Sequence, residues 1–333
     1  MGKKVSIRQV AEHAGVSVAT VSLALSGKGR ISSDTVRQVK KSAATLGFIP
    51  NRSASRLRSG RSLLIGLVVN DIANPFFAEL SADVEAHASE NGYLSVIANT
   101  NDDIEKQASV IETMIGQGVA GFIIVPADTS TPDTFQVIRD HDMPYVLCVR
   151  DIGDGKADFI GFDNFTAGVM AAEHLVEKGH RTFAFVGGRL SVDNFRRRLD
   201  GVRHALARHG LTLPDNCVRE GVPSRAIGLA ETGDLLASGA EFTALICYND
   251  FVAVGAYAAL NQAGRTIGED VAVVGFDNVP ESESLSPPLT TIELYPRAIG
   301  NRSARALIDA VNGSSGPHER VYLAPELISR SST

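Results

Sequence analysis

From residue 63 onward, short runs of apolar residues alternate with longer amphipathic stretches. The runs Phe122-Ile123-Ile124-Val125 and Val271-Ala272-Val273-Val274 are uninterrupted, as is typical of parallel strands that helices cover on both faces. Between such runs, apolar residues recur at helical spacing. This alternation predicts an α/β body built from doubly wound parallel sheets with right-handed crossovers.

The alternating order of expected strands and helices is nearly the same in two successive parts of the body. This repetition predicts two lobes with a cleft between them. The expected strands are 63–69, 93–98, 120–125, 145–149, 159–162, 182–186, 217–221, 244–247 and 271–276, and the expected helices are 76–90, 104–117, 134–141, 166–178, 194–209, 225–237 and 251–263. The last segments of the body are expected to cross back to the first lobe, namely strands 290–294 and 320–323 and helix 296–311. The first lobe is thus expected over about 62–161 plus 291–325, and the second over about 162–290.

The chain before this body has a different pattern, that of three short helices. A capping box of Ser6 and Gln9 predicts the start of the first helix, and Gly15 predicts the turn that ends it. A second helix is expected over 18–25 and a third over 33–46. Two helices joined by a tight glycine turn have the sequence form of an all-α helix-turn-helix module.

Charge separates the same two parts of the chain. Residues 1–60 hold eleven Lys and Arg against Glu12 and Asp34, a formal charge of +9, whereas the whole chain carries −6. A phosphate backbone attracts a separate positive patch of this kind. We therefore expect a DNA-binding domain over 1–49, a basic and serine-rich hinge over 50–61, and a ligand-binding and dimerisation domain over 62–333.

Composition and missing motifs exclude several classes of protein. No apolar run approaches the roughly 20 residues that span a bilayer, and no apolar segment of a secretory signal follows the basic start. The scattered Cys148, Cys217 and Cys247 suit free thiols, so we expect a cytoplasmic protein without a membrane partner. The chain lacks a P-loop, a strand-linked GxGxxG, a GxSxG elbow and an HExxH motif. We expect no enzyme activity, no catalytic residues, no cofactor and no metal.

The runs 16–22 and 50–57 resemble the headpiece and hinge of the lactose-repressor/galactose-repressor family of bacterial transcription regulators, and the likeness extends along the whole chain. The resemblance implies a two-lobed body similar to periplasmic binding proteins, which senses a small molecule. It also implies a hinge helix that enters the minor groove of DNA.

The resemblance assigns DNA-contacting roles to individual residues. Val18 and Ala19 fall where the recognition helix meets bases, and Leu57 falls at the leucine that wedges into a base step. At Leu23 many members carry Arg or His, whereas apolar side chains recognise thymine methyls but cannot form bidentate hydrogen bonds to guanine. The expected DNA-binding residues are Ser6, Ser17, Val18, Ala19, Thr20, Ser22, Leu23, Arg30, Asn51, Ala54, Arg56 and Leu57.

Ligands of parallel sheets bind at the carboxyl ends of the strands, and here those ends are polar. Arg198, three residues before Gly201, has the spacing of the family's effector-binding arginine. The resemblance implies effector-binding roles for Phe76, Phe77, Asp163, Arg198, Asn249 and Asp277. Asp163 and Asn249 have an alternative interpretation as helix N-caps, and Phe77 as a core residue.

Together these features predict a ligand-responsive transcriptional repressor. A hinge too polar to fold alone implies a homodimer, with a tetramer left open, on a palindromic operator in double-stranded DNA. A sugar or sugar derivative is the first choice of effector, and a purine is the second. Two other classes stay open: a solute-binding protein for sugar transport, and an α/β sugar-metabolising enzyme.

Overall fold

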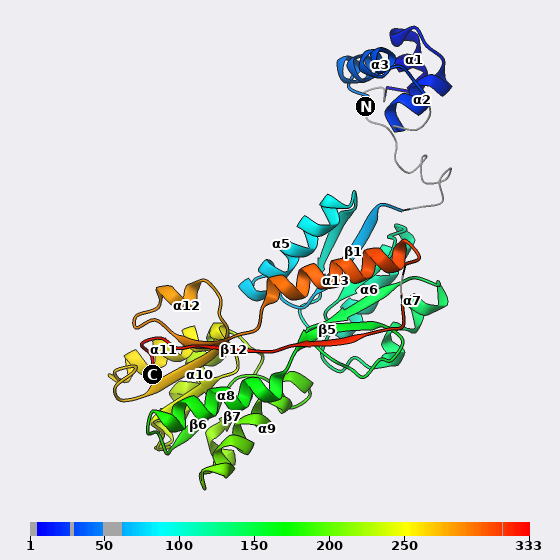
Figure 1. The fold of residues 1–333 in the computed structure, drawn as a ribbon. Helices are drawn as coiled ribbons and strands as arrows, with labels where there is room; N and C mark the ends of the chain where they lie inside the picture. Colours follow the sequence, from blue (N-terminus) through cyan, green and yellow to red (C-terminus); the bar gives the residue numbers. More distant parts are fainter. Residues whose placement is uncertain (1–4, 27–29, 49–61, 315) are drawn as a thin grey trace. The chain divides into compact units, whose positions relative to one another are not determined.

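A computed structural model describes residues 5–26, 30–48, 62–314 and 316–333. The chain divides into two compact units, Met1–Ser62 and Leu63–Thr333. Each unit has a hydrophobic core of its own. Figure 1 shows the helices and strands of both units. No helix in the described ranges is long and apolar enough to cross a membrane.

The first unit contains three helices, α1 (Ile7–Ala14), α2 (Val18–Ser26) and α3 (Ser33–Leu46). The expected capping box is present, since the Gln9 side-chain oxygen accepts the Ser6 N–H at 2.8 Å. Gly15 ends α1 in the left-handed region, at φ 64°. The helices bury one small core, made of Val10, Ala11, Ala14, Val21, Ala24, Val39 and Ala43. The predicted helix-turn-helix is confirmed.

The first lobe of the second unit has a six-stranded parallel sheet in the order β11-β5-β4-β3-β1-β2. Its strands are β1 (Leu64–Val69), β2 (Leu94–Asn99), β3 (Phe122–Ile124), β4 (Tyr145–Cys148), β5 (Asp158–Phe162) and β11 (Arg320–Leu323). Its helices are α5 (Pro75–Glu90), α6 (Ile104–Gly116), the 3-10 turn η1 (Pro132–Phe135), α7 (Gln136–Asp140) and α13 (Pro296–Val311). Helix α13 lies beside α5 (Figure 1).

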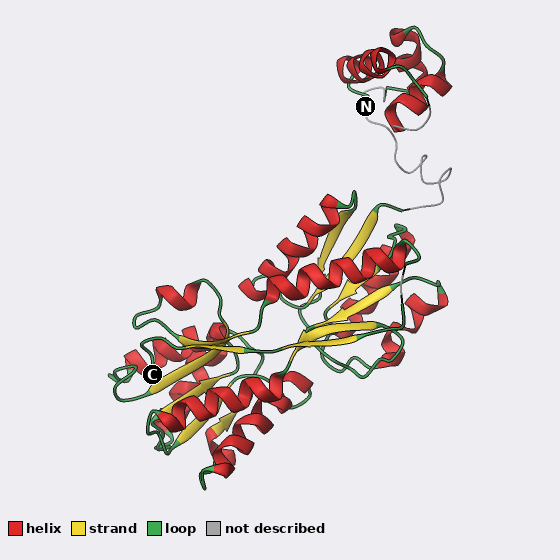
Figure 2. Cartoon of the chain, in the orientation of Figure 1, coloured by secondary structure: helices red, strands yellow, loops and turns green. Residues whose placement is uncertain are grey.

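The second lobe has a six-stranded sheet in the order β12-β10-β9-β8-β6-β7, with β12 antiparallel to β10. Its strands are β6 (Phe183–Val186), β7 (Val218–Arg219), β8 (Ala244–Cys247), β9 (Ala272–Asp277), β10 (Thr290–Glu293) and β12 (Glu326–Ile328). Its helices are α8 (Asn164–Glu177), α9 (Asp193–Arg208), the 3-10 turn η2 (Asp215–Cys217), α10 (Arg225–Ala237), α11 (Asp250–Gln262) and α12 (Glu281–Ser284). Helices cover the sheets as Figure 2 shows.

The predicted pair of parallel α/β lobes is confirmed, but one assignment of a segment to a lobe is wrong. Strand β10 was expected in the first lobe and instead pairs with β9 in the second, because Thr291 donates its hydroxyl to the buried Asp250 of that lobe at 2.6 Å. The chain crosses back only after β10, with α13. Strand β12, which the sequence analysis did not predict, then returns to the second sheet.

Candidate functional site

Helix α2 presents an apolar surface to solvent. Val18, Ala19 and Leu23 are exposed on it, while Val21 and Ala24 on its other side are buried in the three-helix core. The exposed surface therefore consists of methyl groups, which suit contacts with thymine methyls in a major groove. This is the side of α2 to which the family resemblance assigns base contacts.

Hydroxyl groups stand at the start of the same helix. Ser17 accepts the Thr20 N–H at 3.1 Å, and the two hydroxyls lie 2.9 Å apart, so Ser17 caps the start of α2. Ser6 likewise caps α1, and Ser22 is half-buried. The capping roles leave both hydroxyls at the surface, where each can also meet a phosphate.

Positive charge surrounds these helices. Arg8, Arg30, Lys40 and Lys41 are exposed, whereas Arg37 forms an ion pair with Asp34. Four of the expected DNA-binding residues lie outside the described residues, namely Asn51, Ala54, Arg56 and Leu57.

Arg198 lies at the centre of the predicted effector site and is only 2 % exposed. Its Nε donates to the side-chain oxygen of Asn164 at 2.8 Å, and its Nη1 donates to the backbone oxygen of Tyr248. The rings of Phe162, Tyr248 and Phe276 surround its guanidinium, with centroids 5.6, 4.7 and 4.6 Å from its central carbon. Arg198 is therefore rigidly held at the carboxyl ends of β5, β8 and β9.

Asp277 ends β9 with a positive φ of 107° and is 7 % exposed. Burial raises the pKa of this carboxyl well above its usual range, although the nearby Arg198 lowers it. Its side chain makes no hydrogen bond within the described part of the chain. A largely buried carboxyl that makes no hydrogen bond is costly, so Asp277 is suited to receive a hydrogen-bonding ligand.

Two other predicted residues have the capping role that the sequence left as an alternative. Asp163 accepts both the N–H and the hydroxyl of Thr166, at 3.0 and 2.7 Å, and Asn249 accepts the Val252 N–H at 3.0 Å. They begin α8 and α11 beside Arg198.

The two predicted phenylalanines start α5 in the other lobe. The Phe76 ring is buried and makes edge contacts with Phe77 and with Phe162, at centroid distances of 5.3 and 6.1 Å. Since Phe162 also lies against Arg198, the structure brings these aromatic residues and Arg198 into one cluster. Phe77 is only half-buried.

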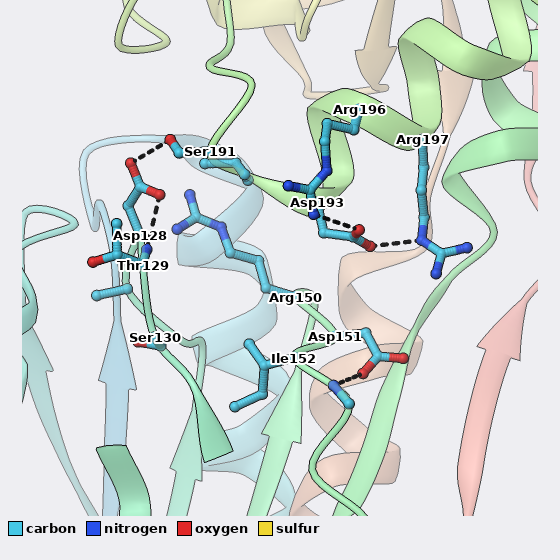
Figure 3. A pocket seen from close by; sticks show the side chains of 13 residues that line it. Asp128, Thr129, Ser130, Arg150, Asp151, Ile152, Ser191, Asp193, Arg196 and Arg197 are labelled. Carbon is cyan, nitrogen blue, oxygen red and sulfur yellow. Dashed lines mark hydrogen bonds and ion pairs between the residues drawn. The ribbon is translucent and has the colours of Figure 1, made fainter. Parts of the chain in front are cut away.

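Two pockets lie where loops of both lobes meet. The first, of about 340 Å³, is lined by residues that include Asp128, Arg150, Ser191 and Asp193 (Figure 3). The second, of about 390 Å³, is lined in part by Asp163, Asn164, Asn194, Arg197 and Tyr322. Of the six predicted effector residues, only Asp163 lines either pocket.

Arg150 is the main residue of this region that sequence reasoning missed. Both of its terminal nitrogens pair with Asp102, and Nη1 also donates to the Pro126 carbonyl at 3.1 Å. Burial lowers the pKa of Arg150, but Asp102 more than offsets this and the pKa is raised. Arg150 directly follows the apolar run that ends at Val149, so it lies at the carboxyl end of a strand. This position was the signal in the sequence that could have identified it.

A tight turn directs Arg150 into the pocket. Val149 has a φ of 68°, and the Arg150 N–H donates to the Cys148 carbonyl at 2.7 Å across it. A positive φ is strained for a β-branched residue and is concentrated at functional sites. The Val149 carbonyl also accepts the side-chain amide of Asn194 from the other lobe at 3.3 Å.

A helix-turn-helix unit with an exposed apolar surface on its second helix, joined to a two-lobed body with polar side chains at its strand ends, is typical of a ligand-responsive DNA-binding regulator. Residues 6–51 match "Bacterial regulatory proteins, lacI family", and residues 172–333 match "Periplasmic binding protein-like domain". The chain belongs to the lacI family of bacterial regulatory proteins.

Relatives and a solved structure agree along the whole chain. The chain is 36% identical to the maltose regulon regulatory protein MalI of Escherichia coli K12, covering 97% of each, and 30% identical to the ribose operon repressor of the same organism, covering 98% and 99%. It matches the crystal structure of the lac repressor dimer bound to operator and the anti-inducer ONPF with a TM-score of 0.88 and 28% identity, covering 99% of each.

The function follows from the family and the fold. The chain is a DNA-binding transcriptional repressor that responds to a small effector, and not an enzyme. The predictions of the family, the fold class and the cytoplasmic location are thereby confirmed.

Proposed function

We propose that the effector is an uncharged, hydroxyl-rich molecule, a sugar or a close derivative, which binds between the lobes to Arg198 and Asp277. The observation that carries the proposal is the buried Asp277 carboxyl, held beside Arg198 without a hydrogen bond inside the described ranges. Neighbouring hydroxyls of a sugar can donate to such a carboxyl and accept from a guanidinium at the same time.

The balance of charge favours a neutral ligand. Arg150 forms an ion pair with Asp102, and Arg197 with Asp193, with Nε 2.6 Å from the carboxylate. Arg198 has the Asp277 carboxyl nearby. An anionic ligand such as a sugar phosphate would have to compete with a carboxyl group at each of these arginines. A neutral polyol disturbs none of these pairs.

The aromatic residues favour a sugar over a purine. A flat purine binds best between two free ring faces. Phe162, Tyr248 and Phe276 are already in contact with Arg198, and Phe76 is buried. This leaves Phe77 as the half-buried ring on which one apolar face of a sugar can stack. Two of the relatives are named for a maltose regulon and a ribose operon.

Thermal-shift screening followed by calorimetry tests this proposal. Neutral pentoses, hexoses and disaccharides are compared with sugar phosphates and with nucleobases. A neutral sugar should stabilise the full chain, and Asp277→Asn and Arg198→Lys should each weaken its binding at least about tenfold, because a buried charged hydrogen bond contributes about 1.5–3 kcal/mol. Asp200→Asn, an exposed change on the same helix α9, is the matched control. Binding of only phosphates or purines would overturn the proposal.

We further infer that the chain binds its operator as a homodimer. Strand β2 is the edge of the first sheet, yet Leu94, Val96 and Ile97 on it are exposed, Leu94 by 56 %. An apolar edge strand is an aggregation hazard unless something covers it. A second copy of the chain is the occupant we propose, in keeping with the dimeric lac repressor that the chain resembles. Asn51, Ala54, Arg56 and Leu57 are then the proposed hinge contacts to a palindromic operator.

A further inference from the structure

One carboxylate joins the two lobes across the first pocket. Asp128 lies in the loop after β3, and its Oδ2 accepts the Ser191 hydroxyl at 2.9 Å. The same oxygen lies 3.1 Å from Nη1 of Arg189. Ser191 and Arg189 belong to the loop between β6 and α9 in the other lobe, and Figure 3 shows Asp128 turned toward Ser191 across the pocket.

The Asp128 carboxylate is held in place on its own side. Its Oδ1 accepts the Thr129 N–H at 2.8 Å, in a turn where Thr129 has a φ of 64°. Its backbone N–H donates to Asp102 at 2.9 Å. Asp102 also forms an ion pair with Arg150, which lines the pocket. The hydrogen bond between the lobes is therefore connected to Arg150 through Asp128 and Asp102.

Arg189 depends on this carboxylate. Its side chain is 36 % exposed and that of Asp128 only 9 %, so the pair is partly shielded from water. Its Nε is buried and lacks a hydrogen-bond acceptor among the described residues. Loss of the Asp128 charge would therefore leave a partly buried guanidinium without its counter-ion, which favours movement of the loop toward water.

We propose that Asp128 is a positioning residue that latches the two lobes over the pocket through Ser191 and Arg189, and so sets how far they are closed before an effector binds. The other hydrogen bond described above between the lobes, from Asn194 to the Val149 carbonyl, is neutral and buried. The latch, by contrast, combines charged side chains on two surface loops, which can separate and re-form. It rests on the proposed function only for the statement that the effector binds between the lobes.

Distances between spin labels in the ligand-free full chain test the latch without knowledge of the effector. Labels are placed on cysteines introduced at the exposed positions Glu112 in the first lobe and Asp200 in the second. The native cysteines are buried, so they leave the labelling selective. Labelled chains are diluted with unlabelled ones, so that each measured distance lies within one chain.

Asp128→Asn and Arg189→Gln should each shift the distance distribution to longer values and broaden it. Arg196→Gln is the matched control, because it removes a charge from the same pocket wall but pairs with Asp193 inside one lobe. Exchanging the two charges, with Asp128→Arg and Arg189→Asp together, should restore the short distances. A merely local packing role would not give this rescue.

Salt gives an independent check. Raising NaCl from about 0.05 to about 0.5 M should lengthen the distances in the wild-type chain, because a partly exposed ion pair is screened, but not in Arg189→Gln. The proposal is overturned if Arg189→Gln, a change that leaves the hydrophobic core untouched, gives the wild-type distribution at low salt. Failure of the sugar screen would leave this result unaffected.

Discussion

Gly201 of helix α9 lies so close to Phe165 of helix α8 that a Cβ at Gly201 would come within 2.1 Å of the Phe165 carbonyl oxygen. The contact is reciprocal, because a Cβ at Gly168 of α8 would lie 2.1 Å from the carbonyl oxygen of Arg198 on α9. Two glycines thus let the helices pack backbone to backbone. This close packing fixes the position of Arg198, which the proposed function places in the effector site.

Replacement of Gly201 by alanine should therefore act on both stability and ligand binding. The added methyl group has no room, so the helices must separate, and overpacking of this kind costs about 1–3 kcal/mol. Because Arg198 lies one turn away on α9, we expect weaker binding of the sugar found by screening. Urea unfolding and calorimetry measure the two effects.

Gly233 provides the control for this change. It lies inside helix α10, and a Cβ there would meet no atom within 4 Å. Gly233→Ala should stabilise the chain by about 0.5–1 kcal/mol, because alanine favours the helix. Equal unfolding free energies for the two alanine variants would contradict the packing argument.

The sequence predicted most of the fold because its signals are local. Capping by Ser6 and Ser17 and the alternation of strands and helices depend only on nearby residues. Assignment of β10 to the second lobe depends instead on Asp250, far away in the chain, which accepts the Thr291 hydroxyl. No pattern within residues 290–294 contains that information.

The candidate site divides in the same way. Arg198 and Asp277 could be named from the resemblance to the family and from the polar strand ends, and the structure brings both to the carboxyl ends of strands in the second lobe. The Asp128 latch could not be predicted, since its partners Ser191 and Arg189 lie in another lobe on a loop without a motif. The sequence could not decide whether Asp163 is a helix N-cap or an effector-binding residue, because one carboxylate can serve both roles.

The two kinds of DNA contact in the headpiece should respond differently to mutation. Arg30→Gln should weaken binding to all sequences and reduce the slope of log affinity against log salt by about one unit, because we propose that this exposed arginine contacts a phosphate. Val18→Tyr should instead change which operators are preferred, because Val18 is exposed on the proposed base-reading surface. Selection from a randomised operator library, followed by titration at several salt concentrations, separates the two.

Lys106→Gln is the control for the headpiece variants, since it removes one exposed charge from the body. It should leave both the ranking of operators and the salt slope unchanged. An unchanged ranking for Val18→Tyr would mean that the recognition surface of α2 is wrongly placed.

The proposed dimer contact at β2 predicts a change of mass. Leu94→Glu places a charge on the exposed apolar edge strand, where burial against a second copy would be costly, so the variant should dissociate at concentrations where the wild type is dimeric. Leu190→Glu, at an equally apolar exposed position in the other lobe, should remain dimeric. Sedimentation equilibrium reports the masses, and a dimeric Leu94→Glu would refute the role of this edge.

The buried carboxyl of Asp250 predicts how stability changes with pH. Burial raises its pKa to about 7, although Ser282, Thr291 and the Val279 N–H donate hydrogen bonds that lower it. Between its ordinary pKa near 4 and this raised value, the folded state holds a proton that the unfolded state has lost. Its contribution to stability is therefore complete in acid and is lost as the pH rises toward 7, by at most about 1.4 kcal/mol per pH unit.

Asp250→Asn isolates this contribution, because asparagine resembles the protonated carboxyl and does not titrate. The difference in unfolding free energy between the wild type and the variant should change steadily from about pH 4 to pH 7, to the disadvantage of the wild type, and should level off above that range. Asp234→Asn, an exposed change on α10, should leave the wild-type profile unaltered. If the Asp250→Asn and wild-type profiles run parallel across the whole range, the carboxyl is ionised throughout, and its three hydrogen-bond donors outweigh the cost of its burial.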